Sequence, residues 1–354
     1  MNTGSKKQKK FLKVVNIMKR TPDLLPSLKD YSSAKKGKQD LRPVPVQMAD
    51  SATDSIQAIS PFKSGKNASV SYSARSKALN FAHPVDRALI EKLDNPIVNT
   101  LFNKFVQASI DANYGLSLAS GIRVSKNNYP ELYEIVEECA DTLGIPVPYV
   151  IISNSVSGMN ASTAGTDQFA FIAMSSMLPM LMDKDELRFV IGHECGHLVM
   201  GHVVYHTAMN LMGVAGGLIP VVGPIVAKTI SYPLNAWSRR SEISADRAGL
   251  ICCGNLDVAK RTLIKLEAGF MNVNDLDIDA YVKDSERLHS SLGLGEMKEL
   301  LYTHPIIPKR LKALDLFCRS KIYAKINPSA DTQGKYLLYD EELKNATEKI
   351  VEVL

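Results

Sequence analysis

The sequence predicts an α+β fold that is mostly helical and contains a small β-sheet. Beyond residue 80, most segments carry apolar residues at helical spacing, and several are bounded by capping or helix-ending residues. Two short apolar runs, residues 149–153 and 168–174, have the composition of strands, and the turn-rich stretch 154–167 between them predicts that they are neighbours. A chain of 354 residues without an evident internal repeat can bury a substantial core in one or two domains.

Helix-boundary signals identify the helices in order. Gly144, with prolines following closely, ends a helix that begins near residue 129. The run Asp183-Lys184-Asp185-Glu186 has the pattern of a capping box and opens a helix that continues through residues 193–197. Further helices are expected at residues 85–120, 235–253, 256–268, 275–290, 308–319 and 339–353.

The positive charge of the chain is concentrated at its N-terminus. Residues 1–47 hold twelve Lys and Arg against three Asp, a net +9, so the remainder carries about −4 of the overall +5. Residues 6–20 have the pattern of a basic amphipathic helix, and residues 21–75, rich in Pro, Ser, Lys and Asp, are predicted to be a linker. Two interpretations stay open, an arm that contacts an anionic surface and a solvated tail. Nucleic-acid binding is disfavoured because no aromatic residues alternate with the lysines.

Cysteine usage points to a reducing compartment. The five cysteines are odd in number, irregularly spaced and form no CxxC pair, which argues against a disulfide framework. The longest uncharged run near the start is too short for a signal peptide, so the predicted location is cytoplasmic. The expected organisation is a basic, largely disordered or extended segment at 1–80, a body at 81–320 and a C-terminal helical extension at 321–354.

The segment His193-Glu194-Cys195-Gly196-His197 predicts a metal site. Two histidines four residues apart lie about one helical turn from each other on one face, so both imidazoles can bind one ion. Zinc suits neutral imidazole and tolerates the open position that catalysis needs. Glu194 is placed to accept the proton of an attacking water without binding the metal. The motif is short, and the alternative is a pair of surface histidines without a metal.

A third ligand on a second helix favours the metal site over that alternative. The sequence does not continue as HExxHxxGxxH, because Met200 and Val203 stand at the glycine and histidine positions, which excludes a metzincin. Glu242 is the candidate ligand, with Asp246 one turn further on the same face, where it can accept the outer N–H of a ligand histidine. Otherwise Glu242 would be a surface acid beside two arginines.

Small residues predict that these two helices approach each other closely. Gly192 and Gly196 lie on the first helix, and Ala245 and Gly249 lie on the second. Glycine inside a helix costs about 1 kcal/mol relative to alanine, so its use suggests a need for close backbone contact. A shared metal ion requires that contact.

On these residues the sequence resembles the HtpX-like and CaaX prenyl protease family of zinc metallopeptidases, from about residue 83 to 317. The resemblance rests on Asn160-Ala161 with Gly165, on HECGHLVMGH at 193–202, on SEISADRAGL at 241–250, and on His304-Pro305 with Arg310. It implies a gluzincin-type scaffold in which the edge strand of a small sheet lies beside the active-site helix, and one Zn²⁺ per chain.

The resemblance also implies roles for residues outside the metal motif. Asn160 and Ala161 would position an extended substrate by β-addition. His304 and Arg310 would reach the active site, with His304 donating a hydrogen bond to the oxyanion of the tetrahedral intermediate. His202 is nine residues past His193, half a helical revolution away, so it cannot share the metal from the same helix. It is predicted to be hydrogen-bonded in the core rather than a ligand.

Residues 208–227 form an apolar stretch of twenty uncharged residues, nominally enough to cross a bilayer. A single crossing would put His193 and His197 on one side of the membrane and Glu242 on the other, which a shared metal forbids. The stretch is therefore predicted to be a buried or lid-like insertion near the cleft. Peripheral contact with a membrane surface, through this stretch or through the basic N-terminus, remains a hypothesis.

The sequence thus predicts a zinc metalloendopeptidase that hydrolyses protein or peptide substrates. The alternative is a catalytically silent protein, chaperone-like or a scaffold, that retains a structural zinc site at a membrane surface.

Overall fold

The computed structural model describes residues 70–93, 121–154, 156–165, 170–207, 224–269, 272–291, 304–328 and 336–351. All of them belong to one structural unit, Ser60–Leu354. Several predictions lie outside the described residues: the basic helix at 6–20, most of the linker at 21–75, the second part of the helix at 85–120, and most of the apolar stretch at 208–227.

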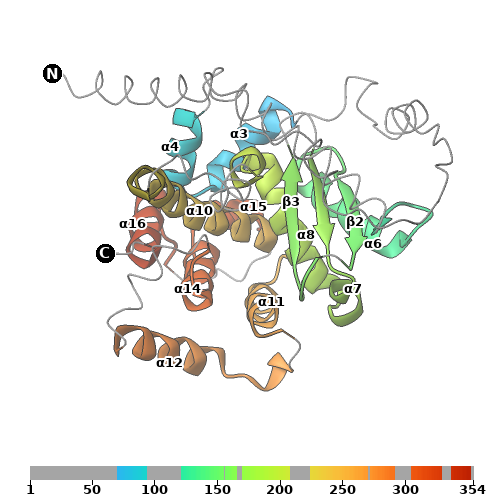
Figure 1. Ribbon diagram of the computed structural model, residues 1–354. Helices are drawn as coiled ribbons and strands as arrows, with labels where there is room; N and C mark the ends of the chain where they lie inside the picture. Colours follow the sequence, from blue (N-terminus) through green and yellow to red (C-terminus); the bar gives the residue numbers. More distant parts are fainter. Residues whose placement is uncertain are drawn as a thin grey trace, which may run out of the picture. The chain divides into compact units, whose positions relative to one another are not determined.

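The sheet has four strands in the order β1-β2-β4-β3 (Figure 1). Strands β2 (Tyr149–Ser153) and β4 (Ala170–Met174) pair in parallel, which confirms the two predicted neighbours. Strand β1 (Gly121–Arg123) pairs antiparallel with β2 on the outer side. Strand β3 (Ala161–Gly165) pairs antiparallel with β4 and forms the other edge of the sheet.

Strand β3 lies inside the stretch that the sequence pattern predicts to be turn-rich. Its five residues, Ala-Ser-Thr-Ala-Gly, include a single β-branched side chain and no large apolar one, so they give little strand signal. Their pairing with the apolar strand β4 determines the structure here. The resulting edge strand is the one that the family resemblance implies.

Helix α8 (Lys184–Met200) carries the metal motif, and its two ends are defined by local hydrogen bonds. The Asp183 carboxylate accepts the backbone N–H groups of Asp185 and Glu186 at 2.9 Å, and Glu186 accepts the Asp183 N–H at 3.0 Å, as the capping box predicts. The helix ends at Gly201, whose φ of 77° lies in the left-handed region. Because the chain turns there, His202 does not continue the helix, and the predicted half-turn offset from His193 does not apply.

Helix α10 (Pro224–Cys253) packs along α8 at the predicted small residues. A Cβ atom built on Gly196 would lie 2.7 Å from the Ala248 Cβ and 3.1 Å from the Ala245 Cα. One on Gly249 would lie 2.8 Å from the Phe189 carbonyl oxygen. These distances are shorter than van der Waals contact, so glycine is required for the two backbones to approach this closely. The inference drawn from the small residues is confirmed.

Other helices surround this pair (Figure 1). The predicted helices at 129–143 and 256–268 are found as α6 (Pro130–Leu143) and α11 (Leu256–Ala268). Helix α3 (Tyr72–Phe81) begins inside the predicted linker and packs against α8. The remaining helical elements are α4 (Pro84–Leu93), α7 (Met177–Leu181), η1 (Val273–Asp275), α12 (Ile278–Ser291), α14 (Ile307–Cys318), α15 (Lys321–Ile326) and α16 (Asp340–Val351).

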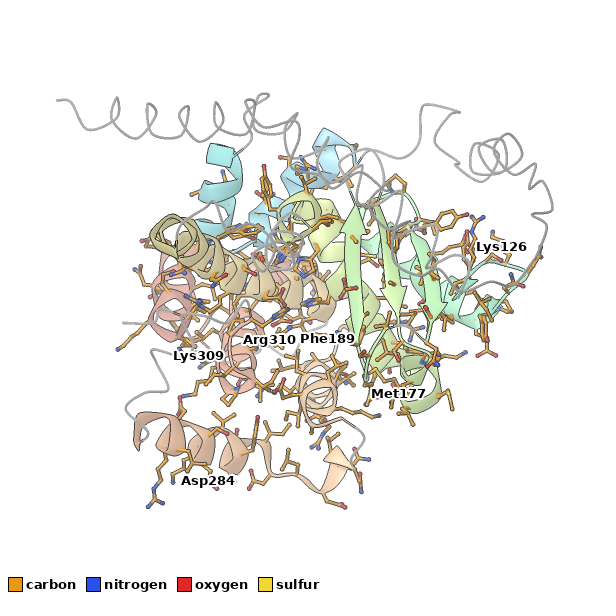
Figure 2. All side chains as sticks on the ribbon, in the orientation of Figure 1. Lys126, Met177, Phe189, Asp284, Lys309 and Arg310 are labelled. Atoms are coloured by element: carbon orange, nitrogen blue, oxygen red, sulfur yellow. The ribbon has the colours of Figure 1, made fainter. Side chains whose placement is uncertain are left out.

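The helices and the sheet together confirm the predicted α+β architecture, mostly helical with a small sheet. Phe189 from α8 and Arg310 from α14 lie in the interior near α11 (Figure 2), where they line one cleft. Within the described ranges, no helix is both long and apolar enough to cross a membrane.

Candidate metal centre and active site

Three side chains from α8 and α10 converge on one point. The His193 Nε2 and His197 Nε2 atoms are 3.2 Å apart, and they lie 3.5 and 3.4 Å from the two Glu242 carboxylate oxygens. Ligands that bind a tetrahedral zinc ion at about 2.0–2.1 Å are separated from one another by roughly 3.3 Å. The three donors therefore have the spacing of a zinc site, and the donor set of two imidazoles and a carboxylate fits that metal.

Hydrogen bonds behind His193 turn its free nitrogen toward this point. The His193 Nδ1–H donates to the Asp246 carboxylate at 3.0 Å, which leaves the Nε2 lone pair facing His197 and Glu242. Burial lowers the pKa of His193, but hydrogen bonds to Asp246 and Glu242 outweigh it and raise that pKa to about 10. The two carboxylates thus favour a positive charge here, which a proton or a metal ion supplies.

Glu242 is a buried carboxylate that remains ionised. Its residue surface is 2% exposed, and burial alone would raise its pKa. The charge of His304 and hydrogen bonds with His193 and His197 outweigh burial and hold the pKa well below its ordinary value. A buried anion that faces two imidazole nitrogens is suited to bind a divalent cation.

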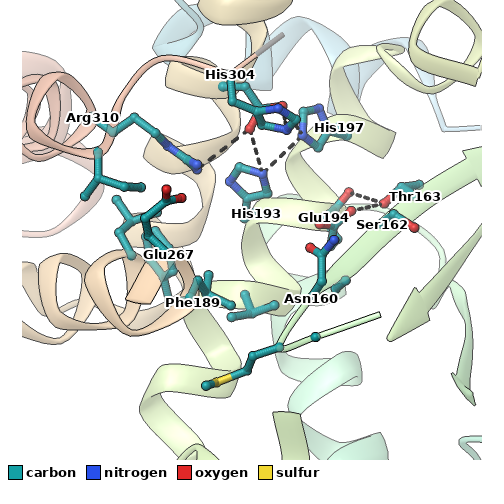
Figure 3. A pocket seen from close by; sticks show the side chains of 18 of the residues that line it. Asn160, Ser162, Thr163, Phe189, His193, Glu194, His197, Glu267, His304 and Arg310 are labelled. Carbon is teal, nitrogen blue, oxygen red and sulfur yellow. Dashed lines mark hydrogen bonds and ion pairs between the residues drawn. The ribbon is translucent and has the colours of Figure 1, made fainter. Parts of the chain in front are cut away.

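Arg310 from α14 reaches toward the two histidines (Figure 3) and stabilises two carboxylates, that of Asp246 behind His193 and that of the donor Glu242. Its guanidinium donates to both Asp246 oxygens, from Nε at 2.7 Å and from Nη2 at 2.5 Å. Nη2 also lies 3.7 Å from Glu242 Oε2. Burial raises the pKa of Asp246, but the charge and hydrogen bonds of Arg310 outweigh it, so the carboxyl stays ionised. Arg310 thus lies at the site, as the sequence predicts, and its strongest contacts are with Asp246.

Glu194 lies beside the three donors and is not one of them. Its residue surface is 6% exposed, and its Oε2 accepts a hydrogen bond from the Thr163 hydroxyl at 2.5 Å. Thr163 belongs to edge strand β3, so the strand holds the carboxylate from the side of the sheet (Figure 3). The sequence pattern contains no signal for this contact, because a threonine in an unrecognised strand is ordinary.

The remaining predicted residues line the same cleft of about 570 Å³. The His304 side chain is 60% exposed, and its Nε2 lies 3.4 Å from Glu242 Oε1. Asn160 precedes β3 and its carbonyl accepts the Ser175 N–H at 2.9 Å, while Ala161 pairs with Met174. The structure therefore brings eight of the nine predicted site residues to one cleft, and the ninth, Asp246, is buried behind His193.

His202 is buried and hydrogen-bonded, as predicted, but its position is different from the one assumed. Beyond the end of α8 the chain brings its Nδ1 to 2.9 Å from the His197 Nδ1. Two further residues of this region, Asp86 and Trp237, were not identified from the sequence. Both are separated from the motifs by long stretches of chain, and each is unremarkable in its own segment.

A motif helix, a glutamate from a second helix and an adjacent edge strand define a metallopeptidase of the gluzincin type. The profile described as Peptidase family M48 matches residues 126–317. The chain belongs to this family. It is 27% identical over 267 residues to "Plastoglobule-localized metallopeptidase 48, chloroplastic" of Arabidopsis thaliana, covering 72% of this chain and 77% of that protein.

Bacterial relatives show the same similarity. The chain is 26% identical over 238 residues to a "Protease HtpX homolog" of Streptococcus gordonii, covering 56% of this chain and 77% of the relative. It is 25% identical over 257 residues to a "Protease HtpX homolog" of Sulfurihydrogenibium sp., covering 63% and 86%. The family implies a bound metal and a peptidase activity toward proteins or peptides.

Proposed function

We propose that this chain is a zinc-dependent metalloendopeptidase that hydrolyses internal peptide bonds of protein substrates. His193, His197 and Glu242 would hold one zinc ion. The observation that supports the proposal most strongly is the tetrahedral spacing of these three donors beside a buried glutamate, Glu194, that is left over for proton transfer.

The chemistry needs a polarised carbonyl and an activated water. A bound zinc ion supplies Lewis acidity for both. Glu194 accepts the proton of the attacking water and passes it to the amine that leaves. The hydrogen bond from Thr163 orients the Glu194 carboxylate for both transfers.

The substrate lies in extended form along β3, the edge strand of the sheet. Strand β3 has no neighbouring strand on its outer side among the described residues, so a substrate strand can be added there, although the Gly165 N–H at its far end already donates to the Thr207 hydroxyl at 3.2 Å. Ala161 begins β3 at the cleft, and Asn160 directly precedes it. An open cleft that receives a strand accommodates the interior of a polypeptide, which favours endopeptidase activity.

His304 is the donor to the oxyanion of the tetrahedral intermediate. Its exposed imidazole is next to Glu242 and lines the cleft, so it faces incoming substrate. One such donor can contribute about 3–4 kcal/mol to the transition state. Arg310 acts through Asp246 and Glu242, whose positions and charge it fixes.

The catalytic domain is assigned to residues 81–320, since the cleft residues come from both sides of the metal motif within this range. Residues 321–354 are a C-terminal helical extension of that domain, and residues 1–80 an N-terminal segment whose last part, helix α3 (Tyr72–Phe81), packs against α8.

The test combines metal analysis with hydrolysis of a denatured protein. The purified full chain is expected to hold one zinc per molecule and to release peptides with internal cleavage sites, identified by mass spectrometry. Chelation should stop the reaction, and one equivalent of zinc should restore it. A zinc-loaded, folded protein that cleaves neither denatured proteins nor peptide libraries would contradict the proposal.

Thr163 offers a prediction about the orientation of Glu194. Thr163→Val keeps the β-branched shape and removes the hydroxyl that donates to Glu194. A hydrogen bond to a charged group contributes about 1.5–3 kcal/mol, so kcat is expected to fall about 10- to 100-fold with zinc content unchanged. Thr163→Ser, which keeps the hydroxyl, should retain most of the activity. Equal kcat values for the two variants would rule out the positioning role.

A further inference from the structure

A continuous row of hydrogen bonds leads from the candidate ligand His197 to a buried carboxylate on α4. The His197 Nδ1 lies 2.9 Å from the His202 Nδ1, and the His202 Nε2 lies 3.0 Å from Asp86 Oδ2. His202 and Asp86 are both 0% exposed, so water does not compete for the hydrogen bond between the His202 Nε2 and the Asp86 carboxylate. Asp86 lies outside the part of the chain that the family profile matches.

Asp86 is held as an ionised hydrogen-bond acceptor. The Trp237 indole N–H donates to Oδ1 at 2.9 Å, and the Ser244 hydroxyl donates to Oδ2 at 2.6 Å. Burial raises the pKa of Asp86, but its interactions with His202 and these hydrogen bonds outweigh burial and bring that pKa below its ordinary value. A carboxylate in this state can only accept hydrogen bonds from its neighbours.

The ionised Asp86 determines which ring nitrogens of His202 and His197 carry protons. Because Asp86 only accepts, the His202 Nε2 donates to it, and a His202 ring that carries this one proton has its lone pair on Nδ1. The short contact between the two Nδ1 atoms then requires the proton to be on His197. With its Nδ1 protonated, His197 presents the lone pair of Nε2 to His193 and Glu242.

We propose that His202 and Asp86 are positioning residues that orient His197 for metal binding and strengthen it as a ligand. The inference rests on the metal site of the proposed function. It gives His197 the kind of support that Asp246 gives His193, with the carboxylate placed one imidazole further away. Such partners of ligand histidines commonly change metal affinity 10- to 100-fold.

A second metal ion between His197, His202 and His206 is the competing explanation, because these three side chains also cluster. The distances favour the hydrogen bonds. Two ligand nitrogens of one zinc ion are about 3.3 Å apart, whereas the His197 and His202 Nδ1 atoms are 2.9 Å apart. The other His202 nitrogen is bonded to Asp86, and the His206 Nε2 lies 2.8 Å from the Ser241 hydroxyl.

The first experiment measures zinc affinity by competition with a chelator. Asp86→Asn keeps the shape of the side chain and removes its charge, and it is expected to weaken zinc binding about 10- to 100-fold. Glu186→Gln is the matched control, because it also removes the charge of a buried carboxylate, one that pairs with Lys265 and makes no contact with His202 or the three donors. Its zinc affinity should change less than 3-fold. Circular dichroism verifies that both variants are folded.

The second experiment needs no variant. Long-range ¹⁵N–¹H correlation spectra of the zinc-loaded wild-type chain report which nitrogen of each imidazole is protonated. We expect the proton on Nδ1 of His197 and on Nε2 of His202. A His202 ring protonated at Nδ1, or two zinc ions per chain, would overturn the proposal.

The outcomes separate this inference from the function on which it rests. If the wild-type chain binds zinc and folded Asp86→Asn binds it equally well, the positioning role alone is wrong. If the wild-type chain has no zinc affinity, the proposed function fails and this inference fails with it.

Discussion

Replacing Glu194 by Gln is expected to lower kcat about 10²- to 10⁴-fold while the protein keeps one zinc ion per chain. Glu194 is not one of the three converging donors, so the metal site should survive the change. Glutamine has nearly the same shape and can still accept the Thr163 hydrogen bond. It has no carboxylate to take the proton of the attacking water, and this loss accounts for the fall in rate.

The measurement is single-substrate kinetics on a fluorogenic peptide, beside metal analysis of the same preparation. Glu186→Gln is the matched control, since Glu186 lies on the same helix but is not one of the three donors. Its Oε2 pairs with the Lys265 Nζ at a distance of 2.8 Å. This variant should keep its activity. If Glu194→Gln were as active as this control, Glu194 would not be the general base. If the zinc-loaded wild-type chain and both variants left the peptide uncleaved, the scaffold alternative would replace the peptidase.

Much of the fold was predictable because local chemistry determines it. The start of α8 follows from the capping box at Asp183, whereas its end at the left-handed Gly201 was not predicted, because the sequence interpretation continued the helix to His202. The two inner strands are apolar enough to be recognised. Strand β3 was not recognisable, since its small residues adopt strand structure through pairing with β4. Local pattern cannot reveal an element that depends on a partner.

The same distinction applies to the site. His193 and His197 could be proposed from their spacing on one helix. Glu242 could be proposed because such a site needs a third ligand from a second helix. Asp86 could not, since its contact with His202 spans 116 positions in the sequence. Its carboxylate becomes interpretable only where the fold brings α4 against the turn that follows α8.

Close packing of α8 and α10 leads to the second large prediction. Gly196→Ala is expected to destabilise the fold by about 1–3 kcal/mol and to weaken zinc binding. In an ordinary helix this change stabilises by about 1 kcal/mol, so the predicted sign is reversed. The new Cβ would lie 2.7 Å from the Ala248 Cβ and 3.1 Å from the Ala245 Cα, which forces the helices apart. Glu242 lies one turn from Ala245 and would move away from both histidines.

A double-mutant cycle identifies the contact. Ala248→Gly alone should cost about 1 kcal/mol through lost helix propensity. In combination with Gly196→Ala, the Ala248→Gly change removes the Ala248 methyl group that the new Cβ would contact. The double variant should therefore be about 0.5–3 kcal/mol more stable than the two single changes predict when their effects are added. Urea unfolding gives the free energies, and chelator competition shows whether zinc affinity recovers with them. If the two unfolding free-energy changes were strictly additive, the contact between positions 196 and 248 would not set the separation of the helices. If zinc affinity stayed normal in Gly196→Ala, the positions of the metal ligands would not depend on that separation.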